Sequence, residues 1–182
     1  MTIATYLLFV LGCMGAADII LFHAIAQSIR RHWESRHELV AHSLRGPIYA
    51  AMFVLVPNCV MQGAWFWVLV ALLAVCLVIS VWDLAIERRS RRLFGGPPKG
   101  EWMLHVAMGI VFLGLLVTAL LEATPWARLP TMIAWQPPAS VPSVLRWILT
   151  LMSIPVLLSG VMDLVAALRV DPTVIQIGRA HV

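Results

Sequence analysis

The stretch of residues 31–46, RHWESRHELVAHSLRG, is strongly polar in a chain that is otherwise mostly apolar, and it holds three of the six histidines. Within it, Glu38 and His42 are four residues apart, and Arg45 follows three residues later. On a helix these three side chains share one face. A carboxylate and an imidazole one turn apart are a ligand pair that suits zinc, iron or manganese. The stretch therefore indicates a metal site or a site that moves protons.

Three further pairs of ionisable residues occur along the chain: Asp18 with His23, Asp83 with Glu87, and Glu101 with His105. Di-iron carboxylate bundles use Glu-x-x-His motifs together with single glutamates, and here the spacing Glu-x-x-x-His occurs twice. We expect a carboxylate and histidine centre that holds one or two ions. Its expected ligands are Asp18, His23, Glu38, His42, Asp83, Glu101 and His105.

Three other polar residues have supporting roles in this hypothesis. Arg45 is expected to orient a carboxylate ligand from outside the coordination shell. Glu87 and Asp163 are candidate proton carriers. His32 and His37 are expected to face solvent.

Two alternatives compete with the metal interpretation. The same residues could form structural ion pairs, because charged side chains often gather at helix ends. Haem is a rival cofactor, with an axial pair drawn from His23, His42 and His105. The acidic residues one turn away argue against an apolar porphyrin pocket, and the sequence has no CxxCH attachment motif.

The composition places these residues in a membrane protein. The 182-residue chain is 61% apolar and 12% charged, whereas soluble domains are about 45–50% apolar and about 25% charged. Several apolar runs exceed the roughly 20 residues that cross a bilayer. We predict an all-α polytopic transmembrane bundle that forms a single domain over residues 1–182. The three cysteines lie in apolar runs and read as small buried hydrophobes.

Five spans are expected, with approximate bounds 3–29, 47–61, 65–86, 101–122 and 144–168. The helix of the second span is expected to begin near Glu38. Small residues in the first span, including Gly12 and Gly15, favour close helix contact. Residues 62–64 are expected to form a tight turn, and residues 124–142 a proline-rich loop that does not cross the membrane.

Basic residues predict the orientation. Residues 30–46 contain four arginines, residues 88–99 contain four arginines and a lysine, and Arg169 and Arg179 follow the last span. Five spans place these eleven of the thirteen basic residues on one side. The positive-inside rule then puts the N-terminus outside and the C-terminus in the cytoplasm of a bacterial inner membrane. The ionisable pairs gather at the cytoplasmic ends, although each such group costs about 2.5–3.5 kcal/mol to insert.

Three short elements carry a resemblance to a known group of proteins. They are ELVAHSLR at residues 38–45, WDLAIER at residues 82–88 and EWMLH at residues 101–105. Their patterns ELxxHxxR, WDxxxER and ExxxH resemble elements of an uncharacterised family of small bacterial multi-span membrane proteins. The resemblance covers roughly residues 15–115, and the family often has an acidic residue where this chain has Gly46. It implies a shared site but no reaction.

The functional hypothesis is an integral membrane metalloprotein with an iron or zinc centre near the cytoplasmic interface. Oxidation of a lipid-soluble substrate by a di-iron centre is the first candidate reaction, and hydrolysis assisted by zinc is the second. The alternatives are a non-enzymatic accessory subunit of a larger membrane complex and a haem-binding electron-transfer protein. Expected partners are membrane lipids and other membrane subunits or a second copy of the chain. Nucleic acid is excluded, because the sequence lacks a basic binding fold.

Overall fold

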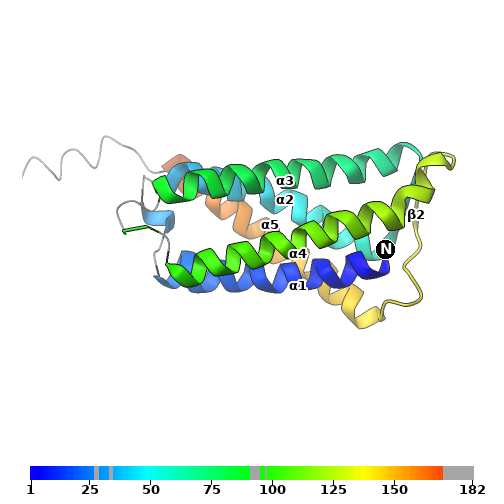
Figure 1. Cartoon of the computed structure of the whole chain (residues 1–182), viewed down its shortest axis with the longest axis horizontal. Helices are drawn as coiled ribbons and strands as arrows, with labels where there is room; N and C mark the ends of the chain where they lie inside the picture. The colour runs from blue at the N-terminus through cyan, green and yellow to red at the C-terminus, as the bar shows by residue number, and fades with distance from the viewer. Residues whose placement is uncertain (27–28, 33–34, 91–94, 97, 170–182) are drawn as a thin grey trace, which may run out of the picture.

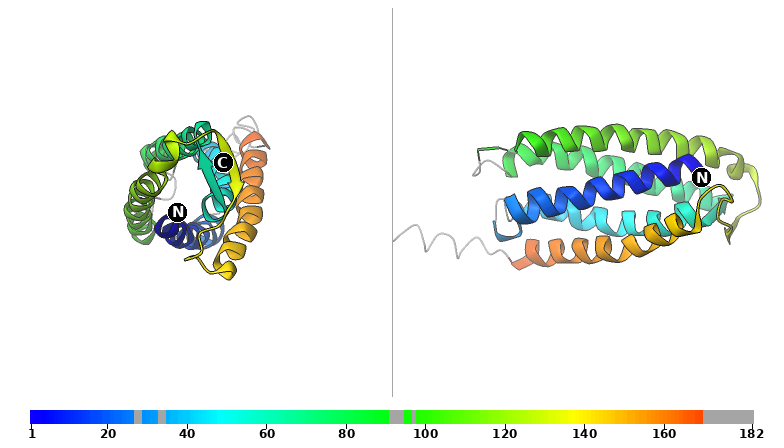
Figure 2. Two further views of the ribbon diagram at one scale, coloured as in Figure 1. Left: turned by 90° about the vertical axis from the view of Figure 1, so that its right-hand side faces the viewer. Right: turned by 90° about the horizontal axis from the view of Figure 1, so that it is seen from below.

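A computed structural model describes residues 1–26, 29–32, 35–90, 95–96 and 98–169. Within these residues, five long helices run side by side along one axis (Figures 1 and 2). They are α1 (Thr2–Asp18), α2 (Arg36–Asn58), α3 (Ala64–Ser90), α4 (Lys99–Ala123) and α5 (Ser143–Arg169). Each helix, with α1 extended to Ile25, is long and apolar enough to cross a membrane. The prediction of a helical bundle with five candidate spans is confirmed.

The two ends of the bundle differ in character. At one end, here called the polar end, α1, α3 and α5 finish and α2 and α4 begin. The largest apolar core, which includes Leu8, Phe53, Leu69 and Leu115, fills the rest of the bundle. The predicted second helix begins at Arg36, so Glu38 and His42 lie in its first two turns. The expected loop residues Arg91 and Arg92 and the tail 170–182 lie outside the described residues.

The opposite end carries a small sheet that the sequence analysis did not predict. Strand β1 (Cys59–Gln62) pairs antiparallel with β2 (Met132–Trp135), with Cys59 opposite Trp135. A 3-10 helix, η5 (Thr124–Arg128), precedes β2. The segment 124–142, predicted only as a proline-rich loop, thus contains a 3-10 helix and a strand. Pairing satisfies the backbone groups that follow the end of α2 at Asn58.

Helices α2 and α5 cross in close contact at two glycines. A Cβ atom added at Gly46 would lie 3.0 Å from Gly160 Cα and 3.1 Å from the carbonyl oxygen of Val156. Pro47 lies one residue along α2 and has no N–H to donate to the carbonyl of Ser43. Gly160 packs close to this carbonyl, since its own added Cβ would be 3.4 Å away. The absence of side chains at both glycines lets the backbones approach.

Candidate metal centre

A change of helix type brings the first two candidate ligands together. Helix α1 ends at Asp18 and continues as a π-helix, η1 (Ile19–Ala26). In an α-helix, residues five apart point about 140° away from each other. A π-helix bonds residue i to i+5, so positions five apart come to one face. His23 Nε2 accordingly lies 3.4 Å from Asp18 Oδ2.

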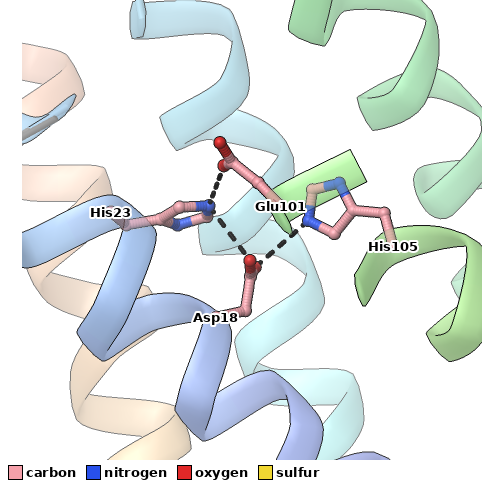
Figure 3. A group of neighbouring side chains, drawn as sticks. All are labelled: Asp18, His23, Glu101 and His105. Carbon is pink, nitrogen blue, oxygen red and sulfur yellow. Dashed lines mark hydrogen bonds and ion pairs between the residues drawn. The ribbon is translucent and has the colours of Figure 1, made fainter. Parts of the chain in front are cut away.

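Four side chains from three elements converge around Asp18 (Figure 3). His23 Nε2 lies 3.3 Å from Glu101 Oε1, and His105 Nε2 lies 3.2 Å from Asp18 Oδ2. One donor atom from each of Asp18, His23, Glu101 and His105 lies within 4.8 Å of the other three. The first three residues are buried, and the side chain of His105 is only 10% exposed. We refer to these four residues as the Asp18 group.

A second group of possible donors shares a residue with the first. His23, Glu38 and His42 also offer donor atoms within 4.8 Å of one another. His23 Nε2 lies 3.9 Å from Glu38 Oε1. The imidazole rings of His23 and His42 stack, with centroids 4.7 Å apart and planes 11° from parallel. A single Nε2 lone pair binds one ion, so His23 cannot serve both groups at once through this atom.

Two arginines neutralise the remaining aspartates at the polar end. Arg45 Nη2 donates to Asp83 Oδ2 at 2.8 Å, as expected of a residue that orients a carboxylate. His42 Nε2 lies 3.5 Å from the same oxygen. The expected ligand Asp83 thus lies beside His42 and Arg45, outside both groups.

Asp163 is paired with Arg30, a partner that the sequence analysis did not identify. Arg30 Nε donates to Asp163 Oδ1 at 2.6 Å, and Arg30 Nη2 donates to Ser159 Oγ at 2.9 Å. Arg30 lies in the 3-10 helix η2 (Ile29–Arg31). In the sequence analysis Arg30 was counted only among the basic residues that predict the orientation. His42 Nδ1 lies 4.0 Å from Asp163 Oδ2, so Asp163 also borders the second group.

Glu87, the other expected proton carrier, contacts the Asp18 group from α3. His105 Nδ1 lies 3.3 Å from Glu87 Oε2, on the side of the ring away from Asp18. A carboxylate on the outer nitrogen fixes the orientation of the ring and leaves Nε2 to face an ion. His37 is exposed, as expected. All the predicted site residues therefore lie at the polar end, and they come from six helical segments: η1 and the five long helices.

Three of the distances between donor atoms in the Asp18 group are compatible with a coordination shell. Zinc binds nitrogen and oxygen at about 2.0–2.2 Å in a tetrahedral shell, which separates neighbouring donors by about 3.4 Å. The three distances of 3.2–3.4 Å are close to this value. Hydrogen-bonded side chains have similar distances, but hydrogen bonding in pairs does not require four donor atoms to lie within 4.8 Å of one another. Among the described residues, the buried Asp18 Oδ1 has no hydrogen-bond partner.

The charges of the Asp18 group also suit a divalent ion. Two carboxylates and two neutral imidazoles carry a combined charge of −2. A divalent ion bound by them would leave a buried unit with no net charge, which lowers the penalty for burying each carboxylate. The donor set of two nitrogens and two oxygens is one that zinc and iron accept.

An apolar cavity of about 660 Å³ adjoins the polar end, and all five helices line it. Its polar lining includes Asp18 and His105 from the Asp18 group, together with His42, Arg45, Asp83 and Asp163. The other lining residues are mainly aliphatic, aromatic or glycine, among them Gly12, Gly15 and Gly109. Of the small residues of the first span, Gly12 is in close helix contact as predicted, because an added Cβ would lie 2.8 Å from both Met152 Cε and Phe53 Cζ, whereas at Gly15 it would meet only Met108 Cε, at 3.9 Å. The volume lies within the roughly 300–1,000 Å³ of small-molecule sites.

The three elements that carried the family resemblance meet at this end of the bundle. Glu38 and His42 come from the first, Asp83 and Glu87 from the second, and Glu101 and His105 from the third. The resemblance itself stays a prediction. Comparison of the chain with protein-family models, curated proteins and solved structures finds no match.

Proposed function

We propose that the protein is an integral membrane metalloprotein that binds a divalent ion in the Asp18 group and acts on a lipid-soluble substrate in the adjoining cavity. The observation that carries this proposal is the convergence of four donors, three of them in buried residues, beside an apolar cavity that Asp18 and His105 line. A bound iron ion would supply oxidation chemistry, and a bound zinc ion would supply Lewis acidity for hydrolysis. The chain's own residues position the ion and exclude water.

The proposal places one ion in the Asp18 group and makes a second ion conditional. A dinuclear centre needs Glu38 and His42 to bind the second ion with a donor other than His23 Nε2. Asp83 could be that donor through Oδ1, which is buried without a hydrogen-bond partner among the described residues, while its Oδ2 stays bonded to Arg45. The Asp18 group offers four donor atoms close together and the second group only three, one of them shared, so the first ion is proposed for the Asp18 group.

Haem receives no support from the histidine arrangement. His23 and His42 stack face to face, whereas axial ligands direct a ring nitrogen at the iron from opposite sides. Between His23 and His105 stands the carboxylate of Asp18, within 3.4 Å of both Nε2 atoms. A porphyrin between these two rings would displace that carboxylate.

A structural subunit is the second candidate function. The short pairs of Arg30 with Asp163 and Arg45 with Asp83 favour it, because they join different helices without an ion. In this alternative the histidines of the Asp18 group are protonated partners of carboxylates. The protein would then hold its helices together by ion pairs and bind metal no better than background.

Metal stoichiometry separates the two functions. Purified protein in detergent is expected to hold about one iron or zinc ion per chain by elemental analysis. His105→Ala is expected to lower metal affinity by about tenfold or more, because losing even an outer-shell partner costs about 10–100-fold. His37→Ala is the matched control, since His37 is exposed on α2, and it should retain the wild-type stoichiometry.

Two glutamates on α4 provide a second matched pair. Glu101 belongs to the Asp18 group, whereas Glu122 lies near the other end of the helix and accepts a hydrogen bond from Ile3 N at 3.0 Å. Glu101→Gln should lose metal, and Glu122→Gln should not. Background metal in the wild-type protein, with lowered melting temperatures for His105→Ala and Glu101→Gln, would reject the metal function and favour the structural subunit.

A further inference from the structure

We infer that the cavity takes an uncharged amphiphile, an alkyl or isoprenoid chain with one oxygen-bearing head group, and holds that oxygen at the polar end. That such a molecule is a substrate rests on the proposed function. The binding itself follows from the cavity alone. The lining runs from Leu11 on α1 to Ile20 at the start of η1, a length of about 14 Å at the rise of an α-helix. Such a slot suits an extended chain better than a compact ring system.

The cavity opens where a molecule dissolved in the bilayer would meet it. Helix α3 packs mainly against α2 and touches α4 sparingly. Lining residues of both α3 and α4 include strongly exposed side chains, with Val81 at 60% and Ile110 at 68%. If the helices span the membrane, this opening faces the acyl chains. An apolar ligand could then enter sideways without passing through water.

The head group is expected to be uncharged because the charged side chains that line the cavity already have partners. Arg45 is paired with Asp83, and Asp163 with Arg30. Asp18 lies 3.4 Å from His23 Nε2 and 3.2 Å from His105 Nε2. A carboxylate head would add an uncompensated negative charge close to three aspartates, and an ammonium head would meet Arg45.

Arg45 supplies a hydrogen-bond donor for the oxygen. Its side chain lines the cavity and is 20% exposed. Only its Nη2 atom donates to a side chain in the described part of the protein, at Asp83. The exposed part of the guanidinium group can therefore donate to a hydroxyl, carbonyl or ether oxygen without giving up that ion pair.

Binding of three radiolabelled probes of equal chain length tests the inference. The probes are 1-dodecanol, dodecanoate and dodecylammonium, added to the full chain in lipid nanodiscs, with empty nanodiscs as the measure of simple partitioning. We expect saturable binding of 1-dodecanol and at least about tenfold weaker binding of both charged probes, given the burial of the charged head. Preference for either charged probe would overturn the inference, and so would binding that does not saturate.

Two glycine variants locate the bound probe. Gly109 and Gly15 line the cavity, and a Cβ atom at Gly109 meets nothing within 4 Å, whereas at Gly15 it meets only Met108 Cε, at 3.9 Å. Gly109→Leu and Gly15→Leu should each weaken 1-dodecanol binding about tenfold, because leucine fills space that the chain needs. Gly114→Leu is the control. Gly114 lies on α4 outside the cavity lining, and a Cβ atom added there would make only an ordinary contact with Leu7. Wild-type binding in both cavity variants would overturn the inference.

Metal analysis of the same samples keeps the two proposals separate. Metal present without saturable 1-dodecanol binding would reject the cavity inference and leave the metal function standing. Saturable 1-dodecanol binding that is lost in Gly109→Leu, in a protein without metal, would uphold the cavity and reject the metal function.

Discussion

At the scale of single residues, the polar end contains two kinds of carboxylate. Asp83 and Asp163 each accept a short hydrogen bond from an arginine, at 2.8 and 2.6 Å. Asp18 and Glu101 instead face histidines at 3.2–3.4 Å. Guanidinium groups stay charged and cannot bind metal, whereas neutral imidazoles can. Asp83 and Asp163 thus have a permanently charged partner, whereas Asp18 and Glu101 face side chains that could share a metal ion with them.

Arg30→Gln should destabilise the protein without removing its metal. Asp163 is 3% exposed and would lose its guanidinium partner, an effect of about 1–3 kcal/mol for a buried acceptor left unsatisfied. Thermal unfolding in detergent measures the loss, and elemental analysis measures the metal.

The double variant Arg30→Gln with Asp163→Asn is the control, because removing the charge of the buried partner should recover much of the lost stability. A wild-type melting temperature for Arg30→Gln, accompanied by loss of metal, would contradict this assignment and place Asp163 among the ligands.

At the scale of elements, the sequence predicts which helices exist better than how they meet. The turn spacing of Glu38 with His42, and of Glu101 with His105, places each pair on one helix face and was readable directly. The contact of Asp18 with His23, five residues apart, could not be predicted in this way. It depends on a π-helix, in which the backbone hydrogen bonds are shifted, and no residue type in the segment indicates that shift.

Contacts between distant elements account for the other features that sequence reasoning missed. Strands β1 and β2 pair residues 70 to 76 positions apart, and both are only four residues long. Arg30 reaches Asp163 only because η2 lies beside α5. The crossing of Gly46 with Gly160 likewise requires knowing that α2 packs on α5. Periodicity along one segment contains none of this pairing information.

Gly46→Ala should lower both stability and metal content. The added methyl group would meet backbone atoms of Gly160 and Val156 at 3.0 and 3.1 Å, so α2 and α5 must move apart. Overpacking of this kind costs about 1–3 kcal/mol. Because α2 also carries Glu38 and His42, its displacement should disturb the polar end.

Gly109→Ala is the matched control, since its methyl group meets no atom within 4 Å. Alanine favours a helix over glycine by up to about 1 kcal/mol, so this variant should be neutral or slightly stabilised. Melting temperature and metal stoichiometry for both variants provide the comparison. Equal effects from the two substitutions would show that the Gly46 crossing has no special importance.

At the scale of the whole molecule, charge and chemistry gather at one end. The helix termini at the polar end adjoin the segments that contain eleven of the thirteen basic residues, and Arg128 and Arg146 lie at the sheet end. Of the seven acidic residues that the structure describes, six lie at the polar end, and Glu122 is the exception. If the protein crosses a membrane with the predicted orientation, the Asp18 group and the polar part of the cavity lining lie toward the cytoplasmic side.

Reporter fusions test this orientation. Basic residues flanking a span are retained in the cytoplasm, so fusions after Gly96 and after Arg169 should report a cytoplasmic location. A fusion after Ala139, between β2 and α5 at the sheet end, should report an external one. Green fluorescent protein, which fluoresces in the cytoplasm, and alkaline phosphatase, which is active outside, give opposite signals at each point. An external signal after Gly96 would reverse the topology and move the candidate metal centre to the outer face of the membrane.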